Sequence, residues 1–179
     1  MQCKKALEEA EGDMEKALLM LRKASGKAAS KKADRELGAG VVRSYIHNNN
    51  QVGVLIELNC ETDFVAKNPE FLALADSIAM HAAAMAPTYV SSDQITDADR
   101  EKITEVMQDE VGQLDKPEDI KAKILEGKLS DYFAQQTLLE QPYVKNPDQT
   151  IGKLIEEAIQ KIGEKIEVGR IVRYGVLEA

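Results

Sequence analysis

The chain has 179 residues, with 23 Lys and Arg against 31 Asp and Glu, so its formal net charge is -8. This length suits one domain of ordinary size with a real core and a small appendage. Apolar residues make up 44% and charged residues 30% of the sequence, which is typical of globular and not of disordered chains. An acidic chain lacks the basic surface that binds nucleic acid through its overall field. We therefore expect no direct nucleic-acid partner.

The sequence also argues against membrane insertion and against a metal centre. No apolar run approaches the roughly 20 residues that span a bilayer, and the polar N-terminus has no signal-peptide pattern. Cys3 and Cys60 stand far apart, without a CxxC pair or a histidine at ligand spacing. This cysteine usage fits a reducing compartment and argues against a disulfide framework or a zinc site.

Residues 1–23 carry two short helical patterns. A turn at Gly12 and Asp13 separates them, and Asp13 is suited to cap the second helix. Two helices this short bury little surface, so they need a further helix or a partner for stability. We interpret residues 1–23 as an incomplete N-terminal helical module.

Residues 24–40 mark the best domain boundary. They are rich in Ala, Lys, Ser and Gly and contain few large apolar residues. Between Arg22 and Arg35 the chain carries six basic residues and one acidic residue, a local net charge of +5. We interpret the segment as a basic linker or a solvated helix that acts as a tether between the module and the core.

Residues 41–179 form the predicted core domain, which begins where the apolar pattern changes to a period of two. The alternation predicts strands at residues 41–47, 52–60 and 165–177, and a polar turn joins the first two into a β-hairpin. In the last strand we expect a single apolar face, which consists of Ile166, Val168, Val172, Tyr174 and Val176.

Helices are predicted between the second and third strands. They are expected to run from Asn68-Pro69 to Pro87, from Thr96 onward, from Pro117 to Gly127, and from Thr150 to Gly163. After Gly127, Leu129, Tyr132 and Phe133 continue in helical spacing. Residues 138–148 contain two prolines and are interpreted as an ordered loop, and the acidic helices within residues 91–140 as a solvated cover over the sheet. The fold class is therefore α+β, with a three-stranded antiparallel sheet covered by helices and a small helical module in front.

The sequence lacks the residue patterns that mark enzymes. There is no GxGxxG or GxxxxGK[ST] phosphate loop, no GxSxG and no HExxH. His47 and His81 have no partner at a readable spacing, and no pair of acidic residues stands out for acid–base catalysis. We expect no catalytic residue, no metal ligand and no cofactor, and we do not interpret the chain as an enzyme.

The connection between the second strand and the next helix is unusual. Its sequence from residue 61 is Glu-Thr-Asp-Phe-Val-Ala-Lys, which places Phe64 beside a carboxylate. Composition alone favours Phe64 and Val65 as core residues packed under the following helix. The other hypothesis is that Phe64 projects as an anchor for a partner, while Asp63 competes for a cation or donor there.

This connection lies in a stretch that resembles a signature of the translation elongation factor Ts family. The stretch is Glu57-Leu58-Asn59-Cys60-Glu61-Thr62-Asp63-Phe64-Val65-Ala66. Cys3-Lys4-Lys5-Ala6-Leu7 with Gly12-Asp13 resembles the N-terminal signature of that family. Further similar segments are Ser44-Tyr45-Ile46-His47, Gly53-Val54-Leu55, Leu139-Glu140-Gln141-Pro142-Tyr143 and Arg173-Tyr174. The resemblance spans essentially the whole chain.

The resemblance implies a guanine nucleotide exchange factor that acts on the GTPase elongation factor Tu. In that family the Thr-Asp-Phe-Val loop enters the partner beside its magnesium site. Carried over by position, the partner-binding residues are Thr62, Asp63, Phe64, Val65 and Ala66. Phe64 would wedge between partner side chains, and Asp63 would help to disturb the network that holds magnesium, so that GDP leaves faster.

The resemblance also implies a second contact through residues 1–23. They resemble the ubiquitin-associated-like module of the family, which docks on the GTPase domain, and Met1 and Cys3 are the expected docking residues. Relatives carry a further helix before the position of Met1, and an Asp is usual where Gln2 stands. We therefore interpret the chain as N-terminally truncated.

The core resembles the short, single-core form of the family, which has one dimerisation-type domain. A single core with exposed strand edges favours a homodimer. The expected location is the bacterial cytoplasm, with the plastid stroma or the mitochondrial matrix as the alternative. The alternative function is a non-catalytic interaction module cut from a larger ribosome-associated polypeptide, which the truncated start and the basic linker suggest.

Overall fold

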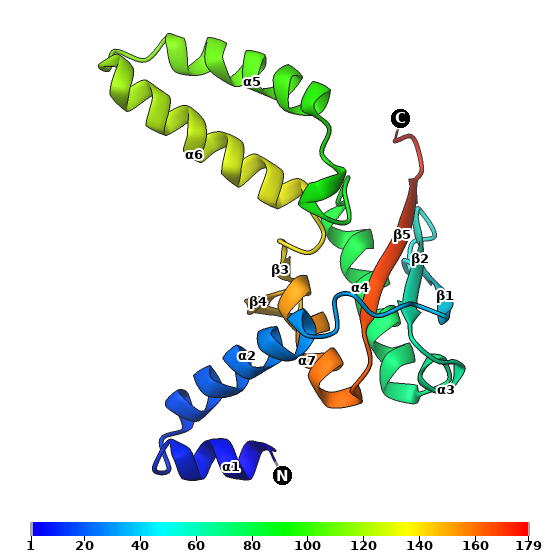
Figure 1. Cartoon of the computed structure of the whole chain (residues 1–179). Coiled ribbons are helices and arrows are strands. Elements are labelled where there is room, and N and C mark those ends of the chain that lie inside the picture. Colours follow the sequence, from blue (N-terminus) through cyan, green and yellow to red (C-terminus); the bar gives the residue numbers. More distant parts are fainter. Residues whose placement is uncertain (1, 179) are drawn as a thin grey trace.

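The computed structural model describes residues 2–178 as a small α+β core from which two pairs of helices extend (Figure 1). The helices are α1 (Gln2–Glu9), α2 (Met14–Ser30), α3 (Asp63–Ala66), α4 (Pro69–Met85), the 3-10 turn η1 (Ser92–Gln94), α5 (Asp97–Gly112), α6 (Glu118–Gln136) and α7 (Ile151–Ile162). The strands are β1 (Ala39–Ile46), β2 (Val52–Cys60), β3 (Pro142–Tyr143), β4 (Asn146–Thr150) and β5 (Ile166–Gly175). The predicted fold class is confirmed.

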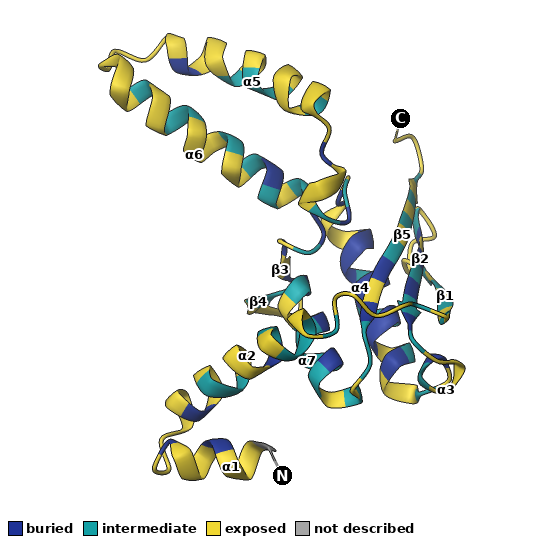
Figure 2. Cartoon of the chain, in the orientation of Figure 1, coloured by how far each residue is buried: buried dark blue, intermediate teal, exposed yellow. Residues whose placement is uncertain are grey.

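The main sheet is antiparallel with the strand order β1-β2-β5. The predicted hairpin closes where the His47 backbone N–H donates to the Val52 carbonyl at 2.9 Å. Helices α4 and α7 cover one face of the sheet, as the burial colours in Figure 2 show. The core between them contains Ile56, Leu58, Phe71, Ile78 and Ile151, all with no exposed surface. The alternation predicted for β2 is therefore confirmed.

The last strand does not keep one apolar face. Ile166 and Val168 are buried, but a β-bulge follows, because Leu58 pairs with Val168 while Glu57 pairs with Arg170. The extra residue, Gly169, reverses the faces of all later residues. Arg173 consequently points to the helix side, where its Nε donates to the Ala83 carbonyl at 3.2 Å. The predicted single face is wrong, since Val172, Tyr174 and Val176 lie on the opposite side and are exposed.

Helix α2 continues seven residues beyond its predicted end at residue 23. Ala, Lys and Ser are compatible with a helix, and α2 packs against α7. Ser25 is buried and its hydroxyl donates to the carboxamide of Gln160 on α7. Residues 24–30 are therefore helical, which was one of the two forms expected, but they are only partly solvated.

The acidic helices α5 and α6 do not cover the sheet, so that prediction is wrong. They pack against each other as an antiparallel hairpin that projects from the core (Figures 1 and 2). Thr96 caps α5 through a capping box with Asp99, as its position predicted. Helix α6 passes through Gly127, so the predicted end there is wrong, because one exposed glycine costs a helix only about 1 kcal/mol. The helical spacing predicted for Leu129, Tyr132 and Phe133 is confirmed. Within the predicted loop 138–148, the chain forms part of the short β3-β4 pair.

Candidate partner-binding site

The connection from residue 61 to residue 67 contains one short helix, α3, between β2 and α4 (Figure 1). Thr62 is the N-cap of α3, and its side-chain oxygen accepts a long hydrogen bond of 3.5 Å from the Val65 backbone N–H. Thr62 is also held by the end of β2, because the Cys60 thiol donates a hydrogen bond to the Thr62 carbonyl at 3.2 Å. Burial raises the pKa of the Cys60 thiol and so keeps this donor protonated. The helix therefore begins at a fixed point of the sheet.

The five predicted site residues separate into anchoring and projecting groups. Ala66 is buried in the core, and Val65 packs against it. Phe64 lies on the other side of α3 and is 83% exposed. The interpretation of Phe64 as a core residue is therefore wrong, whereas the same interpretation holds for Val65. A large exposed aromatic ring on a helix fixed at one face is a candidate anchor for a partner.

Asp63 adds a negative charge beside the Phe64 ring. Its carboxylate accepts a hydrogen bond of 2.8 Å from the Lys67 ammonium group, one helical turn further on, and both side chains are mostly exposed. This hydrogen bond and the charge of Lys67 lower the pKa of Asp63. The carboxylate thus stays ionised at neutral pH and can exchange its exposed lysine for a cation or donor of another molecule.

Two glutamates tie this connection to neighbouring segments, Glu164 from outside it and Glu61 from within it, and neither was among the predicted site residues. Glu164, in the turn between α7 and β5, accepts hydrogen bonds from the Glu61 and Thr62 backbone N–H groups at 3.1 and 3.0 Å. Glu61 in turn accepts from the Lys165 backbone N–H at 2.6 Å and from the Arg35 guanidinium group at 3.1 and 3.2 Å. These bonds lower the pKa of Glu61. Glu164 is separated from Thr62 by 102 positions, and no pattern of spacing reveals the contact.

The expected docking residues of the N-terminal module lie elsewhere. Met1 is outside the described residues, and Cys3 is exposed on α1. Helix α1 packs against α2, whereas α3 packs against β1, β2 and α4. The structure therefore does not bring Cys3 together with the connection around Phe64. Apolar side chains on the module are also exposed, among them Met14 at 63% and Leu18 at 51%.

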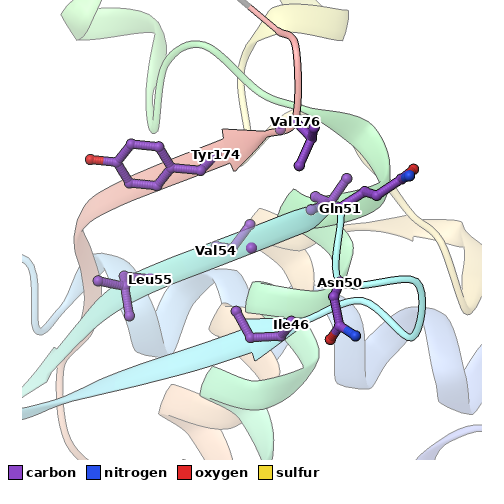
Figure 3. A pocket seen from close by; sticks show the side chains of 10 residues that line it. Ile46, Asn50, Gln51, Val54, Leu55, Tyr174 and Val176 are labelled. Carbon is purple, nitrogen blue, oxygen red and sulfur yellow. The ribbon is translucent and has the colours of Figure 1, made fainter.

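A second apolar surface lies on the side of the main sheet away from α4 and α7. We call it the open sheet face, and it consists of Val42, Ile46, Leu55, Val172, Tyr174 and Val176, which are 44% to 73% exposed. Ile46, Gly53 and Tyr174 occupy neighbouring positions on the three strands. Because Gly53 has no side chain, a depression of about 440 Å³ forms between its neighbours (Figure 3). At one end of the face, Glu57 and Arg170 form an ion pair of 2.6 Å.

The described residues offer no other clear chemical centre. Within residues 2–178, no group of three or more His, Cys, Asp or Glu side chains is placed to hold a metal ion. His81, one of the two histidines, is fully buried, where its Nε2 bonds to the Gln141 carboxamide oxygen at 2.9 Å and its Nδ1 accepts from the Val144 N–H at 3.2 Å. No helix in this part of the chain is long and apolar enough to cross a bilayer. The arrangement is suited to binding through exposed surface.

Comparison with known proteins identifies the family of this chain. The family model described as "Elongation factor TS" matches residues 24–178. The chain is 47% identical over 178 residues to the elongation factor Ts of Thermosipho melanesiensis, covering 99% of this chain and 91% of that protein. It is 48% identical over 178 residues to the elongation factor Ts of Geobacter metallireducens, covering 99% of this chain and 82% of that protein. The corresponding protein of Fervidobacterium nodosum is 45% identical, with 99% and 90% covered. The chain therefore belongs to the elongation factor Ts family of translation elongation factors.

Proposed function

We propose that this chain is a guanine nucleotide exchange factor that accelerates release of GDP from elongation factor Tu. The observation that carries the proposal is Phe64, which is 83% exposed on a helix anchored by Val65 and Ala66. A chain that maintains a large apolar side chain in water at a fixed position has a surface suited to a partner protein. Family membership supplies the identity of that partner.

In the proposed mechanism the loop acts on the magnesium site of the partner. Phe64 inserts between partner side chains, and the Asp63 carboxylate competes for groups that hold the metal. Loss of Mg²⁺ removes the main positive charge that retains the β-phosphate, so GDP dissociates faster. No covalent bond is made or broken. The chain instead binds the nucleotide-free partner more tightly than the GDP-bound partner, and the difference equals its effect on GDP affinity.

A fluorescent-GDP release assay tests the proposal. Elongation factor Tu is loaded with a fluorescent GDP analogue, and the release rate is measured with the wild-type chain and with Phe64→Ala. We expect the wild-type chain to accelerate release and the variant to lose most of that effect. If neither protein accelerates release, the exchange function is wrong. Binding without acceleration would instead favour the alternative of a non-catalytic interaction module.

We further propose that α1 and α2 provide a second contact with the GTPase. Their exposed apolar side chains and the exposed Cys3 lie on helices that pack against each other and apart from the Phe64 loop. Replacing Leu18, which is 51% exposed, by Glu is expected to weaken binding of elongation factor Tu by about five-fold or more. Unchanged binding would exclude this docking surface.

We also propose that the working unit is a homodimer formed through the open sheet face. A sheet buries each apolar face against another layer, and two such faces can stack about 10 Å apart. The face also carries one acidic and one basic residue, Glu57 and Arg170, which suits a self-complementary two-fold contact. Sedimentation should give a dimer mass for the wild type and a monomer mass for Tyr174→Lys. A monomer mass for the wild type, at concentrations where exchange is active, would refute the dimer.

The proposed place of action follows from the family. Elongation factor Ts relatives with 45% to 48% identity come from bacteria. We place this chain in the bacterial cytoplasm, where translation elongation takes place.

A further inference from the structure

The connection that carries Phe64 has few anchors of its own. Helix α3 contains four residues, and only Val65 and Ala66 contact the core. A single helical turn is not stable by itself, because its nucleation costs more than its few hydrogen bonds contribute. Besides these two side chains, contacts at the N-cap residue, Thr62, therefore help to set the direction in which Phe64 projects.

Besides the Cys60 thiol, which donates to the Thr62 carbonyl, Glu164 contacts this N-cap with both oxygens of its carboxylate. Oε2 accepts from the Thr62 backbone N–H at 3.0 Å and from the Glu61 backbone N–H at 3.1 Å. Oε1 accepts from the Thr62 hydroxyl at 2.6 Å. The hydroxyl proton is thus directed at Glu164, which leaves the oxygen lone pairs free for the Val65 N–H. Hydrogen bonds to a charged group are shorter and stronger than neutral ones.

A reciprocal contact strengthens the connection between the two segments. While Glu164 binds backbone N–H groups of residues 61 and 62, Glu61 binds the Lys165 backbone N–H at 2.6 Å. The turn after α7 and the turn after β2 therefore exchange carboxylate-to-backbone hydrogen bonds in both directions. The Arg35 guanidinium group forms an ion pair with Glu61 at 3.1 Å and so adds a positive charge beside this exchange.

We propose that Glu164 is a positioning residue for nucleotide exchange. It holds the N-cap of α3 and so sets the direction of Phe64, without needing to touch the partner itself. This inference rests on the proposed exchange function. Loss of a well-placed interface aromatic costs about 1–3 kcal/mol of binding, so a Phe64 that is only misdirected should cost part of that, and removal of the carboxylate is expected to reduce the acceleration of GDP release on the order of ten-fold.

A double-mutant cycle in the GDP-release assay tests the role of Glu164. The proteins are wild type, Glu164→Ala, Phe64→Ala and the double variant. If Glu164 acts through Phe64, its removal costs little once Phe64 is absent, so the two losses are not additive. The matched control is Glu167→Ala. Glu167 is a nearby glutamate whose carboxylate pairs with the Lys165 ammonium group at 3.3 Å and not with the N-cap of α3. We expect the control to keep wild-type activity.

Amide hydrogen exchange supplies a readout independent of the partner. Glu164→Ala should increase exchange at the Glu61 and Thr62 amides while amides of β2 and α4 remain protected. If the alanine variant does not fold, Glu164→Gln, which has the same length but loses one acceptor oxygen, is judged by the same criteria.

The outcomes separate this inference from the proposed function. Absence of acceleration by the wild type refutes the exchange function and this inference with it. An active wild type with unchanged activity in Glu164→Ala, or with additive losses, refutes only the positioning role. Reduced activity, non-additive losses and faster exchange at the two amides together establish it.

Discussion

Phe64 and Phe71, two of the three phenylalanines, allow a direct test of which side chains serve partner binding and which serve stability. They lie seven positions apart, but Phe64 is 83% exposed and Phe71 has no exposed surface. Phe64→Ala should therefore weaken partner binding and leave stability nearly unchanged. Phe71→Ala should do the opposite, because it empties part of the core between the sheet and α4.

The magnitudes follow from these exposures. Burying the exposed part of Phe64 in a partner would remove about 150 Å² of apolar surface from water. At roughly 25 cal/mol per Å², the upper limit is about 4 kcal/mol. Ordering of side chains at the interface offsets part of this, so we expect a loss of about 1–3 kcal/mol, or roughly 5- to 150-fold in Kd. Phe71→Ala should lower the free energy of unfolding by about 3–5 kcal/mol.

Two measurements decide the matter. Titration calorimetry with nucleotide-free elongation factor Tu gives the Kd, and a thermal scan gives the Tm. We expect Phe64→Ala to shift the Tm by less than about 2 °C and Phe71→Ala to lower it by about 6–20 °C. The reasoning fails if Phe64→Ala reduces the Tm as much as Phe71→Ala, or if it binds the partner with wild-type affinity.

Three further predictions concern stability and are measured by urea denaturation. Burial lowers the pKa of His81, so below about pH 6.5 the unfolded chain binds a proton that the folded chain does not. Stability should therefore fall with decreasing pH by up to about 1.4 kcal/mol per pH unit, until the pH passes below the native pKa. His81→Gln should lose this pH dependence of stability, whereas His47→Gln, at an exposed position, should keep it. Equal pH slopes in the two variants would show that His81 is not its source. Gly127→Ala should stabilise by about 0.5–1 kcal/mol, because Gly127 is an exposed helix residue and an added Cβ would meet no atom within 4 Å beyond the adjacent helix backbone. Gly163→Ala should destabilise by about 1 kcal/mol, because its φ of +94° is unfavourable for a residue with a Cβ. If both glycine variants changed stability in the same direction, this reasoning would be wrong. Thr137→Val should be neutral or stabilising by about 1 kcal/mol, since the buried Thr137 Oγ1 has no hydrogen-bond partner among the described residues. A clear loss of stability would mean that this hydroxyl is bonded after all.

Local patterns predicted much of the fold. The alternation in β2 indicated its buried face, and Asn68, Thr96 and Thr150 each cap the helix that follows. These signals are readable because capping and alternation depend on neighbours in sequence. The sheet and its hairpin were accordingly predicted with boundaries within a few residues.

Features that depend on distant residues were not predicted. The bulge at Gly169 results from how β5 pairs with β2, and a lone glycine in a strand does not specify it. The exposure of Phe64 could not be derived from composition, because a helix of four residues is too short to show a periodic face. The hydrogen bonds of Glu164 join segments about 100 positions apart, and only the folded chain reveals them.

The hydrogen bonds at the base of the α5-α6 hairpin allow its length to change independently of the core. The Thr88 and Tyr89 N–H groups donate to the Gln136 carbonyl at 2.9 and 3.0 Å, and the Leu138 N–H donates to the Tyr89 carbonyl at 2.8 Å. The chain thus leaves the core and returns to it at the same point. Insertions and deletions between these residues change the length of the projection without moving the sheet, so relatives can gain or lose helical turns there while the core and the Phe64 loop stay in place.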